Sequence, residues 1–303
     1  MPGVLLLGAG GFIGRAVLRE LRDGGHRVIC VDRHPPAAGH AASEEWRDAD
    51  LLAAPPDELA ALLRGEAAAV INCAGVTAGD AELQVRANAL LPARLLTALA
   101  GSGRRLVHLG SAAEYGAAPA GTSLDEEAPA RPVSDYGVAK LAGTLLVVNA
   151  ARAGSVDGVV LRLFNPLGPG MPPASMPGRA AAAIREARDA GRDAIRMGAL
   201  DARRDFVDVR DVAAAVVAAA LAPALPEPLL NVASGAAVQV REVVRAIADA
   251  AGWAGRIEED PALGSERSTG VTWQRASIER IGSALGWSPR HDLAAAAASV
   301  FEE

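Results

Sequence analysis

The chain contains few cysteines and few aromatic residues. Two cysteines occur in 303 residues, Cys30 and Cys73, and each lies in an apolar run that predicts a strand. A small secreted domain held together by disulfides would carry more, so we expect two free, buried thiols in a reducing cytoplasm. The five histidines are scattered, and no cysteine–histidine group has metal-ligand spacing. We therefore expect no metal site.

Basic clusters and long apolar segments are also lacking. The formal net charge is −6 and no basic stripe is present, so neither nucleic acid nor an anionic membrane surface is an expected partner. The longest apolar run, Val212 to Leu225, is shorter than the ~20 residues that a membrane-spanning helix needs, and we expect a buried helix there. Residues 1–8 lack the basic region of a signal peptide and predict a strand instead.

The first half of the chain alternates between two kinds of segment. Short branched-apolar runs have the pattern of strands buried on both faces: Val4–Leu7, Val28–Val31, Ala69–Asn72, Leu106–Leu109 and Val159–Leu163. Longer stretches with helical spacing lie between them: Phe12–Asp23, Pro56–Arg64, Leu83–Ala100 and Tyr136–Ala151. This alternation predicts an α/β fold with a doubly wound parallel sheet of the Rossmann type.

The second half has a looser pattern. A loop rich in proline and glycine is followed by a predicted helix at Arg179–Ala190, a strand near Ile195, and strands at Val207–Val209 and Leu229–Val232. We expect these segments to interleave, so that some rejoin the sheet and others form a smaller α/β substrate-binding cap. The expected domains are 1–165 with about 205–232 for the dinucleotide, and 166–204 with 233–303 for the cap.

A glycine-rich turn joins the first predicted strand to the first helix. Its residues are Gly8, Gly10, Gly11, Phe12, Ile13 and Gly14. Glycines in this context allow a tight turn and let a pyrophosphate approach backbone N–H groups at a helix N-terminus. The alternative is a glycine-rich surface turn, but the strand before it and the helix after it favour a dinucleotide site.

Two charged residues at the end of the second strand bear on the choice of cofactor. Asp32 can accept hydrogen bonds from the adenosine ribose hydroxyls, which favours NAD. Arg33 can instead pair with the 2′-phosphate of NADP. We expect NAD, with NADP as the alternative.

Further residues complete the predicted cofactor site. Asp50 and Leu51 follow a polar turn, where the carboxylate either lies near the adenine or forms a helix N-cap. Cys73, Ala74 and Gly75 close the third strand with small side chains. Such residues suit a backbone that lies close to a ligand.

The two tyrosines of the chain both lie in motifs. Tyr136 and Lys140 are four residues apart at the start of a predicted helix and project from one face. A lysine ammonium stabilises a phenolate and can also bond the nicotinamide ribose. Ser111 stands just past the fourth strand, where it can align a substrate oxygen with Tyr136. The alternatives are that Tyr136 and Lys140 lie on a solvated helix face and that Ser111 is only a turn residue. The occurrence of all three groups in order at one sheet edge favours an active site.

Taken together, these motifs resemble those of the extended short-chain dehydrogenase/reductase family, in its nucleotide-sugar branch. The resemblance spans nearly the whole chain and includes the segments Arg162–Gly170, Arg204–Val212, Asn231–Gly235 and Leu285–Pro289. It implies that Tyr136 is the acid/base, Lys140 its partner and Ser111 the carbonyl-orienting group.

The same resemblance implies a substrate site and a partner. Ala112, Ala113 and Asn165 would lie at the substrate, and Arg204 and Arg267 would contact a nucleotide diphosphate. Guanidinium groups suit phosphate oxygens. The family also implies a homodimer, packed through Leu83–Ala100 and Tyr136–Ala151.

The residues between Ser111 and Tyr115 bear on the reaction. Family members that dehydrate or decarboxylate the sugar carry an acidic residue where this chain has Ala112 and Ala113, and alanine cannot transfer a proton. Glu114 resembles the residue at this place in some reductases of 4-keto-6-deoxy nucleotide sugars; in an extended segment its side chain would point away from the face of its neighbours.

We therefore expect an NAD(P)-dependent enzyme that reduces the C4 ketone of an NDP-4-keto-6-deoxyhexose. One alternative is an NDP-sugar 4-epimerase that retains NAD. Others are a non-catalytic dinucleotide-binding protein and an enzyme that acts on a free sugar acid or small alcohol.

Overall fold

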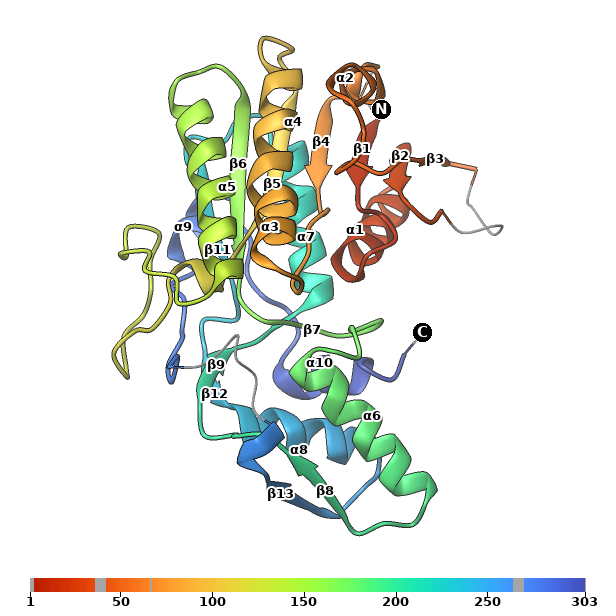
Figure 1. Ribbon diagram of the computed structural model, residues 1–303, viewed down its shortest axis with the longest axis vertical. Coiled ribbons are helices and arrows are strands. Elements are labelled where there is room, and N and C mark those ends of the chain that lie inside the picture. The colour runs from red at the N-terminus through yellow and green to blue at the C-terminus, as the bar shows by residue number, and fades with distance from the viewer. Residues whose placement is uncertain (1–2, 36–41, 66, 264–269, 303) are drawn as a thin grey trace.

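The computed structural model describes residues 3–35, 42–65, 67–263 and 270–302. Its centre is a parallel sheet with the strand order β11-β6-β5-β4-β1-β2-β3 (Figure 1). The strands are β1 (Val4–Leu7), β2 (Val28–Asp32), β3 (Glu44–Asp48), β4 (Ala69–Asn72), β5 (Arg105–Ser111), β6 (Asp157–Leu163) and β11 (Leu229–Val232). The predicted doubly wound Rossmann-type fold is confirmed.

Helices cover both faces of this sheet because its strand residues are apolar on both sides. Leu6 of β1 packs into one core with α1 (Phe12–Asp23), α7 (Val209–Leu221) and α9 (Glu279–Leu285). Leu5 and Leu7 point the other way, into a core with α2 (Pro56–Leu63), α4 (Leu91–Leu99) and α5 (Asp135–Arg152). Neighbouring strands end in register, with Leu7 opposite both Val31 and Asn72. Loops that follow these strands therefore meet at one edge.

Strand β3 was not predicted from the sequence. It consists of Glu44–Asp48, lies at the sheet edge and, among the described strands, pairs only with β2. An edge strand is half exposed, so it needs no apolar run, and charged side chains there discourage pairing with another chain. A strand of this kind has no buried apolar run that would predict it from the sequence.

The remaining elements lie beyond the carboxyl edge of the sheet, in the lower part of Figure 1. A third core joins α6 (Met176–Asp189), α8 (Val240–Ala250), α10 (Leu293–Ser299), β8 (Ala194–Met197) and β13 (Arg256–Glu259). Short two-stranded sheets pair β7 (Pro166–Leu167) with β10 (Val207–Asp208), β9 (Arg203–Asp205) with β12 (Ala237–Gln239), and β8 with β13. A 3-10 turn, η3, covers Pro261–Leu263.

The predicted strand Val207–Val209 is shorter than expected and has a different partner. Val207 and Asp208 pair with β7 rather than with the large sheet, and Val209 already begins α7.

In the part of the chain that the structure describes, no helix is both long and apolar enough to cross a membrane.

The predicted helix Leu83–Ala100 is interrupted. The structure has α3 (Ala81–Val85), a π-helix η1 (Arg86–Leu90) and then α4. Within the π-helix the N–H of Leu91 donates to the carbonyl of Arg86, five residues earlier. Pro92 has no N–H to give to the Asn88 carbonyl, which disfavours a regular helix at this point. Apolar spacing alone did not indicate the interruption.

Helix α5 packs closely against the π-helix at a glycine. A methyl group on Gly143 would lie 2.2 Å from the carbonyl oxygen of Asn88. We expect Gly143→Ala to push the two helices apart and to lower the free energy of unfolding by about 1–3 kcal/mol, measured by urea denaturation. Gly282→Ala in α9 is the matched control, because its nearest neighbour atom would be 3.6 Å away; it should be neutral or slightly stabilising. Equal effects of the two variants would contradict this account of the packing.

Candidate functional site

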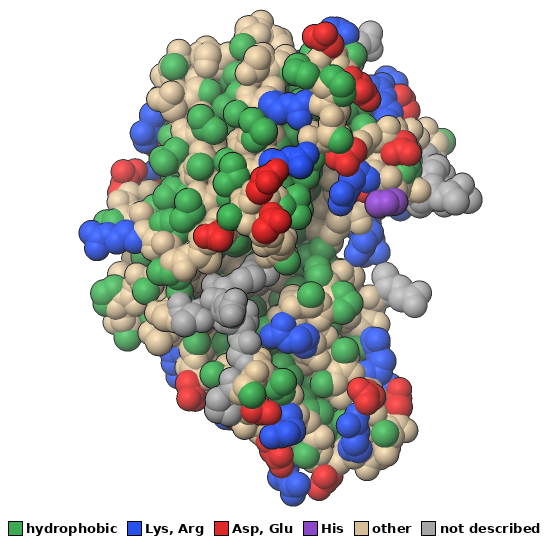
Figure 2. Space-filling view, in the orientation of Figure 1, with side chains coloured by type: hydrophobic (Ala, Val, Ile, Leu, Met, Phe, Trp, Pro, Cys, Tyr) green, Lys and Arg blue, Asp and Glu red, His purple; other side chains and the backbone are tan. Residues whose placement is uncertain are grey.

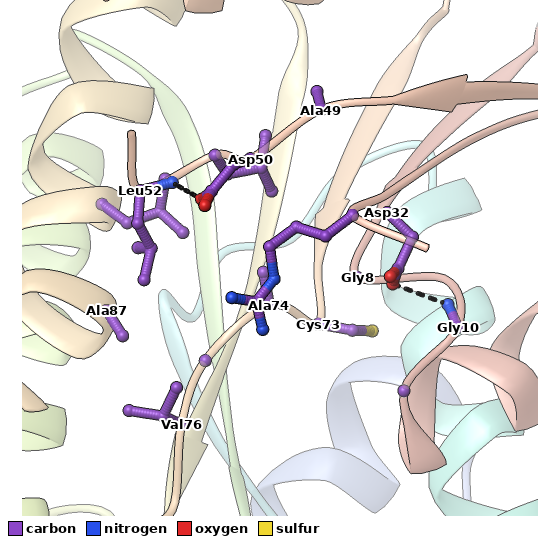
Figure 3. Close-up of a pocket in the computed structure, with 15 residues that line it drawn as sticks. Gly8, Gly10, Asp32, Ala49, Asp50, Leu52, Cys73, Ala74, Val76 and Ala87 are labelled. Atoms are coloured by element: carbon purple, nitrogen blue, oxygen red, sulfur yellow. Dashed lines mark hydrogen bonds between the residues drawn. The ribbon is translucent and has the colours of Figure 1, made fainter. Parts of the chain in front are cut away.

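A pocket opens where β1, β2 and β4 end. It is lined by Gly8, Gly10, Gly11, Asp32, Arg33, Ala49, Asp50, Leu51, Leu52, Cys73, Ala74, Gly75, Val76, Ala87 and Leu91. Figure 3 shows Asp32 on one side of this pocket and Asp50 on the other. Most of the predicted cofactor residues line it. The wall residues that the sequence did not indicate come from the loops after β3 and β4, from the π-helix and from the first residue of α4.

The glycine turn is built for close packing. Gly8 has a φ of 75°, and a methyl group on Gly14 would lie 2.0 Å from the Gly8 carbonyl oxygen. Phe12, Ile13 and Gly14 form the first turn of α1, whereas the earlier glycines form the pocket wall. No side chain of the described residues caps the start of α1. Its first N–H groups and the positive end of the helix dipole are therefore suited to a phosphate.

The two carboxylates of the pocket are anchored to backbone N–H groups. Asp32 Oδ2 accepts from the N–H of Gly10 at 2.9 Å, and Oδ1 accepts from the N–H of His34 at 3.2 Å. Asp50 Oδ1 accepts from the N–H of Leu52 at 2.9 Å (Figure 3). Asp50 therefore closes a turn and does not begin a helix. Both residues lie where the sequence predicted them, at the pocket wall.

The elements that carry the predicted catalytic residues meet at the carboxyl end of β5. Ser111 ends this strand and begins the 3-10 turn η2 (Ala112–Glu114). Tyr136 lies in the first turn of α5, and this turn packs on η2, since a methyl group on Gly137 would lie 2.6 Å from the Ala113 carbonyl oxygen. Ser111 and the start of α5 are thus neighbours.

Lys140 is the only lysine of the chain, and its side chain is buried. Its Nζ donates to the carbonyl of Leu109 at 2.8 Å and lies 3.5 Å from where a methyl group on Gly75 would be. The ammonium therefore reaches the wall of the pocket. Burial lowers the pKa of Lys140 to about 8, against the opposing effect of the Glu114 carboxylate.

Asn88 of the π-helix is a further polar residue at this point, and the sequence analysis did not identify it. Its side chain is fully buried, and its amide donates to the Val76 carbonyl and to Gln84 Oε1, both at 2.9 Å. Its Oδ1 has no hydrogen-bond partner among the described residues and lies 2.9 Å from the position of a methyl group on Gly75. An amide oxygen is thus directed at the same pocket wall as Lys140.

Glu114 is buried, contrary to our expectation. The segment after Ser111 forms a 3-10 turn and not an extended strand, which brings the carboxylate inward. Its Oε1 accepts from the N–H of Ser111 at 2.7 Å and from the Thr144 hydroxyl at 2.9 Å; its Oε2 accepts from Arg162 Nε at 2.6 Å. Arg162 also lies over the ring of Tyr115, 4.6 Å from its centroid.

The predicted substrate residues are in different surroundings. Ala112 and Ala113 form η2 beside Ser111. Asn165 has a φ of 35°, and its amide donates to the Asp205 carbonyl at 2.7 Å. Arg204 is buried and donates to the carbonyls of Arg203 and Val271. Arg267 lies outside the described residues.

Arg204 carries a charge that no described carboxylate neutralises within ion-pair distance. Burial lowers its pKa to about 10, so the guanidinium remains protonated at neutral pH.

No group of three or more metal-binding side chains occurs in the described ranges. Burial also raises the pKa of the Cys73 thiol to about 12, so this pocket residue is uncharged.

Comparisons with known proteins agree with this arrangement. The model of the NAD dependent epimerase/dehydratase family matches residues 4–233. The chain is 41% identical to dTDP-6-deoxy-L-talose 4-dehydrogenase (NAD(P)(+)) of Kitasatospora kifunensis, over 96% of this chain and 92% of that protein. It is 30% identical to UDP-glucose 4-epimerase of Azospirillum brasilense, over 96% and 88%. The structure of MoeE5 in complex with UDP-glucuronic acid and NAD superposes with a TM-score of 0.85, at 30% identity and over 99% and 98% of the two chains.

The fold and the pocket define a dinucleotide-binding enzyme of the short-chain dehydrogenase/reductase type. The chain belongs to the NAD-dependent epimerase/dehydratase family, as its resemblance in sequence predicted.

The burial of the single lysine predicts an unusual titration. In protein labelled with [¹³C]lysine, one side-chain signal should titrate near pH 8 in the cofactor-free enzyme, because burial disfavours the ammonium. A midpoint near the ordinary value of 10.5 would show that the amine is solvated.

The same burial predicts that Lys140→Met stabilises the cofactor-free enzyme. The lowering of the pKa from 10.5 to about 8 means that the buried ammonium lowers the free energy of unfolding by about 3 kcal/mol. Loss of the hydrogen bond to Leu109 in the variant offsets about 1 kcal/mol of the gain. We expect a gain of about 2 kcal/mol at pH 7 in urea denaturation. The penalty is complete below pH 8 and falls to zero by pH 10.5, so the gain should disappear at high pH. A gain that persists there would have another cause.

Proposed function

We propose that this enzyme reduces the C4 ketone of an NDP-4-keto-6-deoxyhexose with a nicotinamide dinucleotide. The observation that supports this most directly is the chemistry around Ser111. Tyr136 and Lys140 are the groups suited to move a proton, because Ala112 and Ala113 have none to give and Glu114 is engaged with Arg162 at 2.6 Å. Dehydration and decarboxylation need a further acid or base.

In this proposal Ser111, Tyr136 and Lys140 have distinct roles. The bound dinucleotide supplies the hydride. The Ser111 hydroxyl donates to the C4 oxygen and aligns it, and the Tyr136 phenol gives its proton to the alkoxide that develops there. Lys140, held by the Leu109 carbonyl, stabilises the phenolate that remains. Its contact with the wall at Gly75 is the place where a ribose hydroxyl would be bound.

The cofactor is NAD, and we propose that NADP is accepted as well. Asp32 and Arg33 both line the pocket, and each suits one of the two ribose forms. The curated relative with 41% identity is named for both dinucleotides. Because Asp32 is already bonded to Gly10 and His34, its preference for a free ribose hydroxyl is moderate.

We further propose the predicted division of labour along the chain. Residues 1–165 with about 205–232 bind the dinucleotide, and 166–204 with 233–303 bind the substrate. The unneutralised charge of Arg204 suits a nucleotide diphosphate. Two free thiols suit a cytoplasmic protein.

A 4-epimerase that retains NAD is the second candidate, because the match to UDP-glucose 4-epimerase covers most of the chain. The purified protein is denatured and the supernatant is assayed for dinucleotide. Stoichiometric NAD(H) would favour the epimerase. An empty site, followed by oxidation of NADH or NADPH in the presence of 4-keto-6-deoxy nucleotide sugars, supports the reductase. If none of these ketones supports oxidation of NADH or NADPH, the proposed reductase activity is rejected.

Tyr136→Phe removes the proposed proton donor and leaves the ring in place. We expect turnover to fall roughly a hundred- to ten-thousandfold, whereas the Kd for the dinucleotide should change little, because the pocket is formed mainly by other residues. Steady-state kinetics and calorimetric titration measure the two quantities. Unchanged turnover would exclude the mechanism.

We also propose that the enzyme is a homodimer. Large apolar side chains are exposed on α5 and on the α3–η1 segment: Val138, Leu145, Leu146, Val85 and Leu90. Figure 2 shows green side chains gathered over these elements. An apolar surface of this kind suits association with a second copy.

Leu145→Glu should abolish the dimer, because a charge would be buried in the interface. Sedimentation equilibrium at micromolar concentration would then report a monomer. Leu221→Glu is the matched control, since Leu221 is also exposed but lies at the end of α7; it should remain dimeric. A monomeric wild type, or a dimeric Leu145→Glu, would be evidence against this interface.

A further inference from the structure

Thr144 continues the face of α5 that carries the proposed catalytic pair. Tyr136, Lys140 and Thr144 follow one another at four-residue spacing, so they lie on one side of the helix. Thr144 is fully buried. Its hydroxyl donates to Glu114 Oε1 at 2.9 Å, although a threonine within a helix commonly bonds the carbonyl four residues earlier.

One oxygen atom of Glu114 therefore joins two elements. Oε1 accepts both the Thr144 hydroxyl from α5 and the Ser111 N–H, at 2.7 Å, from the end of β5. Such bonds to a charged acceptor are stronger and shorter than neutral ones. This atom therefore links the Ser111 backbone directly to the face of α5, in addition to the close packing of Gly137 on Ala113 and the bond from Lys140 to Leu109.

The carboxylate has little freedom to move. Its other oxygen, Oε2, is bonded to Arg162 at 2.6 Å, and Arg162 is buried over the Tyr115 ring. The backbone at Gly110 also lies against it, since a methyl group there would be 2.7 Å from Glu114 Oε1 and 3.1 Å from the Thr144 hydroxyl oxygen. A larger residue at position 110 would displace both groups.

We propose that Glu114 and Thr144 are positioning residues that hold Ser111 at its working distance from Tyr136 and Lys140. This inference rests on the proposed function, in which one substrate oxygen must lie between the Ser111 hydroxyl and the Tyr136 phenol. The reaction is sensitive to this geometry, because a displacement of about 1 Å can cost about a hundredfold in rate. Neither residue needs to touch the substrate.

The first test compares Thr144→Val with Thr144→Ser. Valine keeps the shape of threonine without the hydroxyl, whereas serine keeps the hydroxyl. We expect kcat to fall about tenfold or more in Thr144→Val, with the KM for the dinucleotide within about twofold, and to remain near the wild-type value in Thr144→Ser. Thr97→Val is the matched control, because Thr97 lies in α4, is exposed and donates its hydroxyl to the Ala93 carbonyl of its own helix. Wild-type kcat in Thr144→Val, or an equal loss in Thr144→Ser, would overturn the proposal.

The second test asks whether the effect passes through Ser111. The Ser111→Ala variant has no hydroxyl at residue 111 that could be held in position. Adding Thr144→Val to this variant should therefore lower kcat by less than about twofold. An undiminished loss in that background would mean that Thr144 has only a general structural role. If Thr144→Val does not fold, Thr144→Ala, which suits a helix, takes its place in both tests.

These outcomes are distinct from a failure of the proposed function. A wild-type enzyme that turns over no C4 ketone or C4 alcohol of a nucleotide sugar would reject the proposed function, and this inference with it. An active wild type with an unaffected Thr144→Val rejects the positioning role alone.

Discussion

The ion pair between Glu114 and Arg162 is the interaction on which the centre of the molecule depends. Both side chains are buried, and removal of either partner would leave an uncompensated charge in the interior at a cost of about 3–5 kcal/mol. The pair joins η2 to β6. Because Glu114 also holds Ser111 and Thr144, the same charge connects the carboxyl end of the sheet to α5.

The polar contacts continue from this ion pair to strand β11 of the sheet and to α9, which packs on the sheet. Arg162 lies over Tyr115, whose hydroxyl bonds Asn231 Oδ1 at 2.8 Å in β11. The Asn231 N–H donates to Glu126, which pairs with Arg280 of α9. Buried polar groups are stable only when each has a partner. This requirement fixes η2, β6, β11 and α9 relative to one another around the serine.

Sequence reasoning predicted the parts of the fold that depend on periodicity or on a local motif. Buried strands such as Val4–Leu7 were found with their observed boundaries because an apolar run is their direct consequence. Edge strand β3 has no such pattern. The residues that form the π-helix follow the apolar spacing of an α-helix in the sequence, so spacing does not reveal it; Pro92, which has no N–H for the Asn88 carbonyl, and the close packing of Gly143 on Asn88 accompany the interruption.

The candidate site was predictable where its chemistry follows from neighbours in sequence. The glycine turn, Asp32 and the spacing of Tyr136 and Lys140 are of this kind. The composition held a further signal, since Lys140 is the only lysine among 30 basic residues. The inward direction of the Glu114 side chain depends on its ion pair with Arg162, which is 48 residues away in the sequence. The direction of Asn88 Oδ1 toward Gly75 depends on tertiary packing. No local pattern encodes such contacts.

Reductase and epimerase chemistry need the same serine, tyrosine and lysine, so these residues do not separate the two reactions. What separates them is whether the dinucleotide leaves between turnovers. The pocket is formed largely by backbone and small side chains; its charged wall residues are Asp32, Arg33 and Asp50. Both carboxylates already accept bonds from backbone N–H groups of the protein, which leaves less of their capacity for a ligand. Lys140 also reaches this wall beside Gly75 and offers the dinucleotide a further charged contact, so the wall is suited to both reactions and the exchange of the dinucleotide is the property that distinguishes the proposed reductase from the epimerase.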